Sequence, residues 1–257
     1  MLRVLCAALI LVGMNVSGVA AEEEGLIYEL RIYTCEPGKL EALNTRFRDH
    51  TLRMFEKHGM KSVGYWTPSE GPGAENTLIY LLEHSSREAA EKDWSEFRAD
   101  PEWLEIAANS ELAHGKILAK APDSIYLKKT DYSPVIGPPP AGRIFELRTY
   151  HATHGKLDQL NARFRDHTLG LFEKHGMKSY GYWVPADPPK SATTLIYLLD
   201  YPSREAAKES WAAFRADEDW QKVLAESQKE GSLTSAKPES LFLNLVDYSP
   251  VQDESKQ

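Results

Sequence analysis

The sequence predicts an α+β protein built from two tandem ferredoxin-like modules. The hexapeptide at residues 46–51 recurs unchanged at residues 163–168, an offset of 117 residues (163 minus 46), and further segments repeat at the same offset. Within each copy the apolar periodicity changes in the order strand, helix, strand, strand, helix, strand, which is the ferredoxin-like arrangement. Repeats of solenoid proteins are only about 20 to 50 residues long. Each copy is therefore expected to be a small domain with its own core.

The first strand and the long helix of each copy are predicted from periodicity. Residues 26–33 alternate, with Tyr28, Leu30 and Ile32 on one face, so they indicate a half-buried strand, repeated at residues 144–150. Pro37-Gly38 then precedes a helix that ends before Gly59, where a left-handed residue is favoured. The apolar stripe expected on this helix consists of Leu40, Leu43, Phe47, His50, Met54 and His58. Its second copy consists of Leu157, Leu160, Phe164, His167, Leu171 and His175, followed by Gly176.

The rest of the module follows from turn and capping signals. Residues 60–67 and 76–83 predict an antiparallel hairpin joined by a turn rich in proline and glycine. Ser86 is a candidate N-cap for a helix containing Trp94 and Phe97, and Asp100-Pro101 begins a second short helix. Residues 124–130 predict the closing strand. Residues 131–135 recur at 247–251, an offset of only 116, which requires a one-residue deletion between Trp220 and Pro238.

The domain organisation is predicted from composition along the chain. Arg3, the apolar run at residues 4–14 and the small residues 19–21 predict a secretory signal peptide over residues 1–21, with an uncleaved N-terminal anchor as the weaker alternative. Residues 25–133 form the first module, residues 134–142 a Pro/Gly-rich linker, residues 143–251 the second module and residues 252–257 a polar tail. We therefore expect an exported protein, periplasmic or extracellular. After signal cleavage Cys35 is the one cysteine left, so no internal disulfide is expected.

Charge and motifs exclude several classes of function. The formal net charge is −8 and no basic cluster is present, so nucleic acid and anionic membranes are not expected partners. No apolar stretch after the signal is long enough to span a membrane. The sequence lacks GxSxG, P-loop, dinucleotide-binding and HExxH motifs. No Cys/His cluster has zinc spacing, so no metal site is predicted.

Several repeated segments resemble the NIPSNAP domain. They are the strand motif at residues 28–33, the helix end His58-Gly59 and Gly64-Tyr65-Trp66, together with residues 145–150, His175-Gly176 and Gly181-Tyr182-Trp183. The resemblance covers essentially the whole chain after the signal. It implies a relative of the dimeric α/β barrels, so the two modules are expected to pair within one chain as an intramolecular dimeric α/β barrel. No catalytic residues are agreed for that family, and the mitochondrial roles of its best-known members do not fit an exported chain.

His50 and His167 are the sharpest candidates for a functional site. Each is expected on the apolar stripe of its helix, facing the sheet, where a histidine can act as a general base or haem ligand. The alternative is a core histidine hydrogen-bonded to a strand residue. His58 and His175 precede the helix-ending glycines and are interpreted as helix-end stabilisers.

Charged and aromatic residues supply two further groups of candidates. With the apolar strand face packed on the helices, four charged residues would face the space between the two sheets and pair across the pseudo-dimer, or hold a polar ligand there. These residues are Glu29, Arg31, Glu146 and Arg148. Four aromatic residues are core candidates that can also line a cavity for a flat apolar ligand: Tyr65, Trp66, Tyr182 and Trp183.

The function best supported by the sequence is a non-catalytic module that binds a small apolar or aromatic molecule or a protein partner. Two alternatives stay open. One is a cofactor-independent monooxygenase or isomerase of the dimeric-barrel type, with His50 or His167 near the substrate. The other is a haem-binding protein that uses one of these histidines. No cofactor is otherwise expected, and assembly beyond the intramolecular pseudo-dimer is open.

Overall fold

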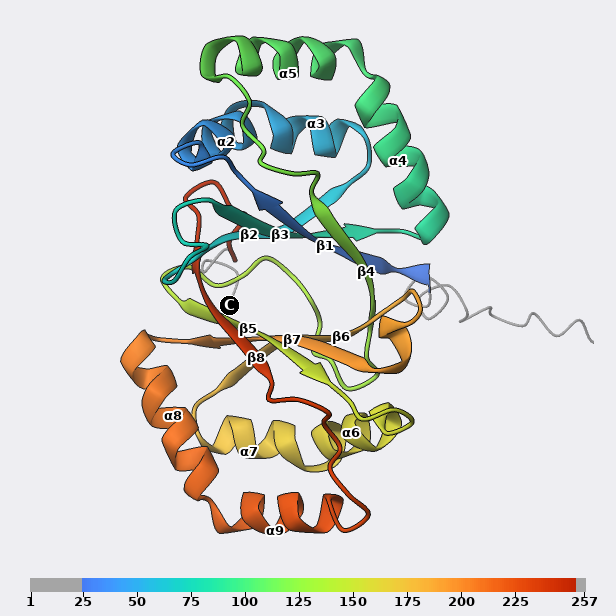
Figure 1. Cartoon of the computed structure of the whole chain (residues 1–257), viewed down its shortest axis with the longest axis vertical. Coiled ribbons are helices and arrows are strands. Elements are labelled where there is room, and N and C mark those ends of the chain that lie inside the picture. Colours follow the sequence, from blue (N-terminus) through green and yellow to red (C-terminus); the bar gives the residue numbers. More distant parts are fainter. Residues whose placement is uncertain (1–24, 253–257) are drawn as a thin grey trace, which may run out of the picture.

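Among the described residues, eight antiparallel strands form one closed barrel, with helices covering the outer face of each half (Figure 1). The computed structural model describes residues 25–252, so the signal predicted for residues 1–21 lies outside the described part. The strand order around the barrel is β1-β3-β2-β8-β5-β7-β6-β4. In the described residues no helix has the length and apolar character needed to cross a membrane.

The two modules have the same order of elements. In the first module these are β1 (Ile27–Thr34), α2 (Leu40–Arg46), η1 (Phe47–Thr51), α3 (Leu52–Lys57), β2 (Lys61–Pro68), β3 (Thr77–His84), α4 (Arg87–Ala99), α5 (Pro101–His114) and β4 (Asp123–Lys129). In the second module they are β5 (Ile144–His151), α6 (Leu157–Arg163), η2 (Phe164–Thr168), α7 (Leu169–Lys174), β6 (Lys178–Pro185), η3 (Lys190–Ala192), β7 (Thr194–Tyr201), α8 (Arg204–Ala216), α9 (Glu218–Ser227) and β8 (Glu239–Leu245).

Local signals place these elements as the sequence predicts. The Ser86 hydroxyl accepts a hydrogen bond from the backbone N–H of Ala89 at 3.1 Å, and the Asp100 carboxylate accepts one from Glu102 at 2.8 Å, so both predicted N-caps are confirmed. Strands β2 and β3 pair as the predicted antiparallel hairpin. Gly59 has φ of 77°, the left-handed value expected after the helix.

The barrel is closed by two seams in which the modules pair with each other. Within the first module the strand order is β4-β1-β3-β2, the order of a ferredoxin-like sheet. At one seam Leu127–Lys129 of β4 pairs with Trp183–Pro185 of β6, and at the other Trp66–Pro68 of β2 pairs with Leu243–Leu245 of β8. The two seams are related by the repeat. The intramolecular dimeric α/β barrel is therefore confirmed, and its closure pairs both edges of every barrel strand.

The part of the chain that the structure describes has three apolar cores. One lies inside the barrel and takes side chains from both modules, including Leu30, Leu81, Leu147 and Leu198. The other two lie between a sheet and its own helices, one in each module. The barrel sheet is thus buried on both faces, which explains the uninterrupted apolar runs in β3 and β7.

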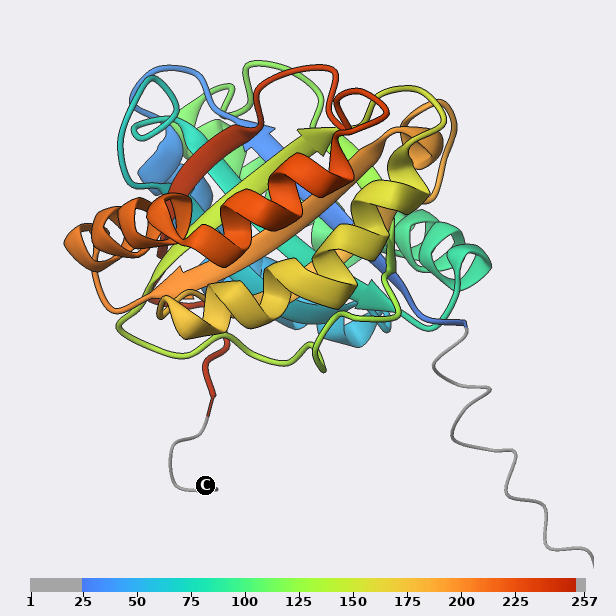
Figure 2. The ribbon, with the colours of Figure 1, turned by 90° about the horizontal axis from the view of Figure 1, so that it is seen from below.

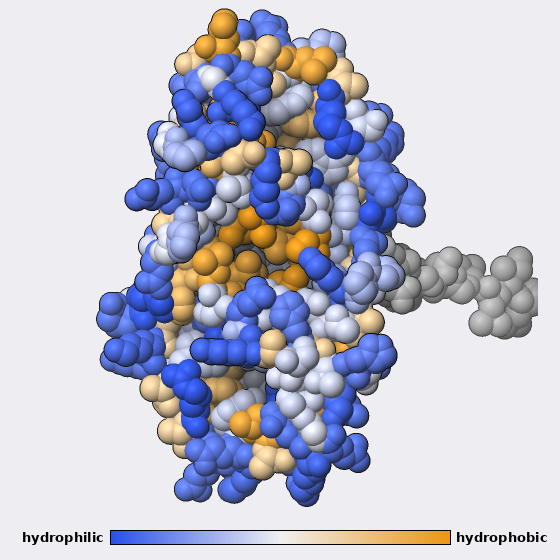
Figure 3. Space-filling view, viewed as in Figure 1, coloured by the Kyte–Doolittle hydropathy of each residue, from blue (hydrophilic) through white to orange (hydrophobic). Residues whose placement is uncertain are grey.

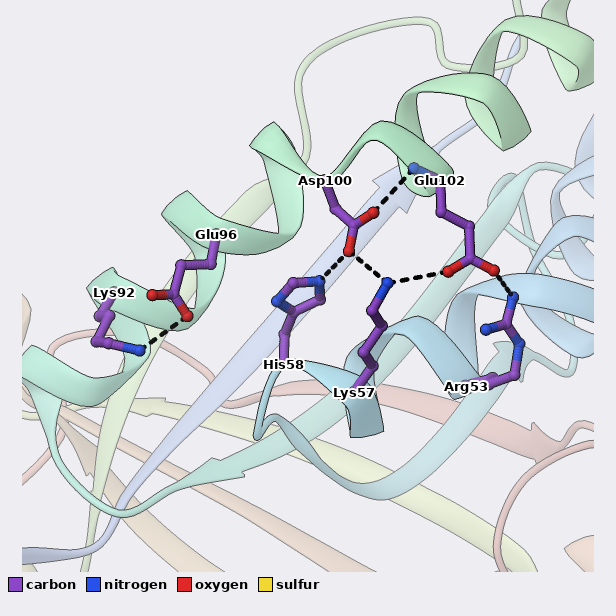
Figure 4. Close-up of polar contacts among 7 residues, drawn as sticks. All are labelled: Arg53, Lys57, His58, Lys92, Glu96, Asp100 and Glu102. Atoms are coloured by element: carbon purple, nitrogen blue, oxygen red, sulfur yellow. Dashed lines mark hydrogen bonds and ion pairs between the residues drawn. The ribbon is translucent and has the colours of Figure 1, made fainter.

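A polar cluster fastens the end of α3 to the junction of α4 and α5 (Figure 4). The Asp100 carboxylate lies 2.8 Å from both His58 Nε2 and Lys57 Nζ, while Glu102 pairs with Arg53 and Lys57. The hydrogen bond from Lys57 holds the pKa of Asp100 well below its usual range, and the His58 contact acts in the same direction against the effect of burial. His175 and Asp217 repeat the contact at 2.6 Å. Both histidines therefore join helix ends.

The long helix of each module contains a π-helical segment that the periodicity did not predict. In η1 the backbone N–H of Leu52 donates to the carbonyl of Phe47, five residues back, and the Thr51 hydroxyl donates to the Arg46 carbonyl at 3.1 Å. η2 repeats both features, with Thr168 donating to Arg163. A π turn holds one more residue than an α turn. It therefore buries Thr51 and Thr168 and turns the preceding histidines outward.

Candidate functional site

One end of the barrel is filled by aromatic side chains. Tyr28 packs edge-on against Trp183 with ring centroids 5.9 Å apart, and Trp66 packs similarly on Phe145 at 5.7 Å. Gly64 leaves room for the ring of Trp66, because a Cβ at that position would collide with the indole. Residues 134–142 contribute Ile136, which is buried in the same core. This end is a packed core.

The other end of the barrel opens into an apolar cavity of about 520 Å³. Figure 3 shows an apolar hollow in the middle of the molecule, between the two helical layers. Most of the cavity surface is apolar, and its lining comes mainly from strands of both modules. The apolar strand residues that line it are Leu30, Ile32, Ile79, Ile125, Leu147, Ile196 and Leu241.

The cavity lies on the pseudo-twofold axis that relates the modules. Its wall contains four pairs of residues separated by the 117-residue offset: Leu30 and Leu147, Ile32 and Thr149, Thr77 and Thr194, and Ile79 and Ile196. Such a position gives the chain one shared cavity. The rim breaks the symmetry, because His151, Lys190 and Glu239 come from the second module, and His151 Nε2 lies 2.9 Å from the Glu239 carboxylate.

A buried glutamate lies between the sheet and the helices of the first module. The Glu29 carboxylate, 0% exposed, accepts hydrogen bonds from Arg31 at 2.7 Å, from Trp94 Nε1 at 2.6 Å and from Ser124 at 2.5 Å, and lies 3.3 Å from His84 Nε2. Burial raises the pKa of Glu29, but the hydrogen bond with His84 and the charge of Arg31 outweigh it and lower the pKa to about 2. Glu29 is therefore a paired anion.

The second module repeats this arrangement with one change. Glu146 accepts from Arg148 at 2.6 Å, Trp211 at 2.7 Å and Ser240 at 2.6 Å, and Tyr201 donates at 2.8 Å from the position equivalent to His84. The expected pairing of these charges across the pseudo-dimer is therefore wrong. Each pair instead forms within its own module, under the helices of that module. The reason is that the apolar faces of β1 and β5 point into the barrel interior.

The expected position of the two helix histidines is also wrong. His50 and His167 are exposed, because the π segments rotate them away from the sheet. His167 lines a surface groove between α6 and α9, together with Arg163 and Asp166. Neither histidine lines the barrel cavity.

The aromatic candidates do not converge on one site. Tyr65 and Tyr182 are buried in the cores under the helices, and their hydroxyls lie within 2.7 Å of Ser62 and Ser179. Trp66 and Trp183 point the opposite way, into the barrel core. Consecutive strand residues face opposite sides of a sheet, so each Tyr-Trp pair is divided between two cores.

Sequence reasoning missed two buried arginines. Arg46 and Arg163 open the repeated hexapeptide and are 8% and 6% exposed, and neither makes a salt bridge with any described residue. The sequence did contain a signal for them, because the same residue, arginine, begins both copies of the repeated hexapeptide. Among the described residues no group of three metal-ligating side chains is positioned to hold a metal ion.

Cys35 is a buried free thiol at the end of β1. Burial raises the pKa of this thiol to about 11, so the unreactive protonated form dominates at neutral pH. Its counterpart Ala152 is buried to a similar extent, which indicates a packing role at this position.

The closed barrel of two ferredoxin-like modules, with a shared cavity on its axis, defines a protein of the dimeric α/β-barrel class. The NIPSNAP family model matches residues 28–134 and again residues 145–250. The chain therefore belongs to the NIPSNAP family, with two tandem domains. A search of curated proteins finds no match.

Solved structures share this architecture at low sequence identity. A candidate monooxygenase from Fusobacterium nucleatum is 9% identical with a TM-score of 0.55, over 89% of this chain and 95% of that chain. A candidate monooxygenase from Lactobacillus acidophilus is 10% identical, also with a TM-score of 0.55, over 89% and 100% of the two chains. An anthrone oxidase-like protein is 13% identical, with a TM-score of 0.55 over 86% and 91%. These likenesses establish the fold alone.

Proposed function

We propose that this NIPSNAP-family protein is an exported, non-catalytic binding module that holds one small apolar molecule in the open end of its barrel. The observation that supports the proposal is the largely apolar cavity of about 520 Å³ on the pseudo-twofold axis. Ligand cavities are typically about 300 to 1,000 Å³, mostly apolar, with a few polar groups that orient the ligand. His151, Lys190 and Glu239 at the rim supply such groups.

The proposed ligand follows from the lining. Burial of apolar ligand surface against Leu30, Ile79, Leu147 and Ile196 provides the main favourable free energy. The polar side chains at the rim can hydrogen-bond to one polar end of the ligand, which would remain near solvent. Export is supported by the signal pattern of residues 1–21.

The oxygenase, isomerase and haem alternatives have less support. They depended on His50 or His167 facing the sheet, and both are exposed on the outer helix face. The likeness to monooxygenase-type structures lies at 13% identity or below. A shared fold at this level does not carry an activity with it.

The test combines native mass spectrometry with a binding titration. Protein purified from its own host compartment is expected to have the mass of a chain beginning at Glu22 and to carry one bound small molecule. The purified protein is expected to bind the neutral apolar fluorophore N-phenyl-1-naphthylamine with a stoichiometry near one.

A cavity-filling variant identifies the site. Thr149 is half-buried at the open end of the cavity, so Thr149→Trp is expected to lower the fluorophore affinity at least about tenfold by occupying its space. Asn244→Trp is the matched control, because Asn244 is exposed on β8 and does not line the cavity. Equal binding by the two variants, or no saturable binding at all, would contradict the proposal.

A further inference from the structure

The groove between α6 and α9 is lined by a buried arginine that has no countercharge among the described residues. Arg163 is 6% exposed and lines the groove, which has a volume of about 670 Å³. Figure 2 shows α9 lying beside the helix that contains α6, on the outer side of the sheet. No carboxylate of the described residues lies within salt-bridge distance of this guanidinium.

The contacts that Arg163 makes are weak for a buried cation. Its Nη1 donates to the Ser227 hydroxyl at 3.3 Å, and its Cζ lies 5.4 Å from the ring centroid of Trp220. Its Nε has no hydrogen-bond partner among the residues that the structure describes. A buried charge without a partner is costly. Burial accordingly lowers the pKa of Arg163. The groove is thus lined by a buried guanidinium that has no carboxylate partner among the described residues.

The equivalent Arg46 of the first module is also buried, and its Nε also lacks a hydrogen-bond partner among the described residues. Burial lowers the pKa of Arg46, while Tyr33 and then the charge of Glu111 on α5 act in the opposite direction. The position equivalent to Glu111 in the second module is Gln228, which is neutral. Helix α5 has 14 residues whereas α9 has 10 and ends at Ser227, close to the one-residue deletion. The second module therefore lacks the internal carboxylate.

We propose that this groove binds the carboxylate of a small organic acid, with Arg163 as its cationic partner. A guanidinium edge matches the planar geometry of a carboxylate. Ala162, Val223 and Leu233 in the lining favour an apolar body on the acid. The other cationic chains of the lining, Lys222 and Lys229, pair with Asp219 and Glu226, whereas Arg163 has no carboxylate partner among the described residues. Inorganic phosphate has no apolar body to pack on this lining. This site is separate from the barrel cavity and its occupancy does not depend on the proposed function.

Calorimetric titration of the mature two-module protein with benzoate tests the proposal. We expect saturable binding of one benzoate, and no saturable binding of the uncharged analogue benzamide or of inorganic phosphate. Arg163→Met is expected to weaken benzoate binding by about 10-fold to 100-fold, the range for loss of a charge-assisted hydrogen-bonded contact.

A second variant keeps the test independent of folding effects at Arg163. Gln228→Glu installs the carboxylate of the first module, so it is expected to compete with benzoate and weaken binding at least about tenfold while retaining the arginine. Arg165→Met is the matched control, because Arg165 is exposed on the same helix and pairs with Asp131 at 2.7 Å. Thr149→Trp, which fills the barrel cavity, is expected to leave benzoate binding unchanged.

Three results would overturn the proposal. They are the absence of saturable benzoate binding, equal binding of benzamide, and benzoate affinity that is unchanged in both Arg163→Met and Gln228→Glu. Loss of fluorophore binding with intact benzoate binding would instead refute only the barrel site.

Discussion

Glu29 and Arg31 show how a charged pair is accommodated under the helices. The carboxylate accepts hydrogen bonds from three side chains, and Arg31 also lies 4.2 Å from the ring centroid of Trp94. Such a pair is stable only while both partners are present, because removal of one leaves an uncompensated buried charge. The second module has Tyr201 in place of His84, so the environment tolerates either donor.

The pKa of Glu29 predicts an acid-dependent part of the stability. Its folded pKa is about 2 and its ordinary value is 4.5, so the carboxylate binds protons more weakly in the folded state. The stabilisation is then fully present above about pH 4.5 and is lost as pH falls towards 2. At 1.36 kcal/mol per pKa unit this contribution is roughly 3 kcal/mol. Glu29→Gln is expected to be less stable than wild type by about this amount at pH 7.

Urea unfolding between pH 7 and pH 2 measures this contribution. The difference in unfolding free energy between wild type and Glu29→Gln is expected to shrink below pH 4.5, because protonated Glu29 is also neutral. Glu75→Gln, at an exposed position in the β2–β3 turn, is the control and is expected to follow the wild-type profile. Parallel profiles for wild type and Glu29→Gln would show that the buried carboxylate is not the acid-sensitive group.

At the scale of elements, the π segments decide which residues face the core. They place Arg46 and Arg163 under the helices and expose His50 and His167. π segments occur frequently at functional sites, and here η2 adjoins the proposed carboxylate groove through Asp166 and His167. The flanking α-helices keep a common apolar face, with Leu43 and Met54 both buried.

A single-residue deletion tests this account of the helix. Deletion of His50 removes the extra residue of η1 and leaves α2 and α3 in register, so it is expected to cost less than about 2 kcal/mol of unfolding free energy. Deletion of Lys92 in the regular helix α4 rotates Trp94 and Phe97 relative to the preceding turn by about 100°. Because both are buried, this control is expected to cost at least about 4 kcal/mol or to prevent folding. Equal losses, measured by chemical unfolding, would contradict the register argument.

The sequence predicts the elements better than it predicts their faces. Caps such as Ser86 and Asp100, and Gly59 at a helix end, are local signals, and the structure confirms them. The π segment has no such local signal, because the apolar spacing of three and four residues also fits a regular α-helix that continues through His50. The face of β1 was misassigned because both faces of the sheet are buried, so an alternating pattern does not identify which face meets the helices.

The candidate sites were less predictable because they too depend on burial and on contacts between elements that are distant in the sequence. The apolar part of the cavity lining consists of ordinary aliphatic strand residues, and barrel closure is what brings them together. Arg163 becomes a candidate only when its burial and its missing countercharge are known. The difference between Glu111 and Gln228 is visible in the sequence, but its meaning depends on the packing of α5 on Arg46, whose Cζ lies 5.7 Å from the ring centroid of Trp103.

At the scale of the whole molecule, each module depends on its partner. An isolated first module would expose the apolar barrel face that includes Leu30, Trp66 and Leu81, and would leave β2 and β4 as open edges. Exposed apolar faces and edge strands favour association. The two seams use equivalent strands, so the first module carries both halves of a seam: Trp66–Pro68 on β2 and Leu127–Lys129 on β4.

We therefore expect residues 25–133, expressed alone, to form a homodimer in which β4 of each copy pairs with β2 of the other. The barrel core would then be rebuilt from two copies of the same apolar face, as the duplication implies. Light scattering after size exclusion is expected to give twice the module mass, and the melting temperature is expected to rise with protein concentration because dissociation accompanies unfolding. A module that stays folded as a monomer at every concentration would show that barrel closure is not what stabilises the fold. The full chain serves as the control, since its two modules are joined by residues 134–142 and its closure within one chain should make its melting temperature independent of concentration.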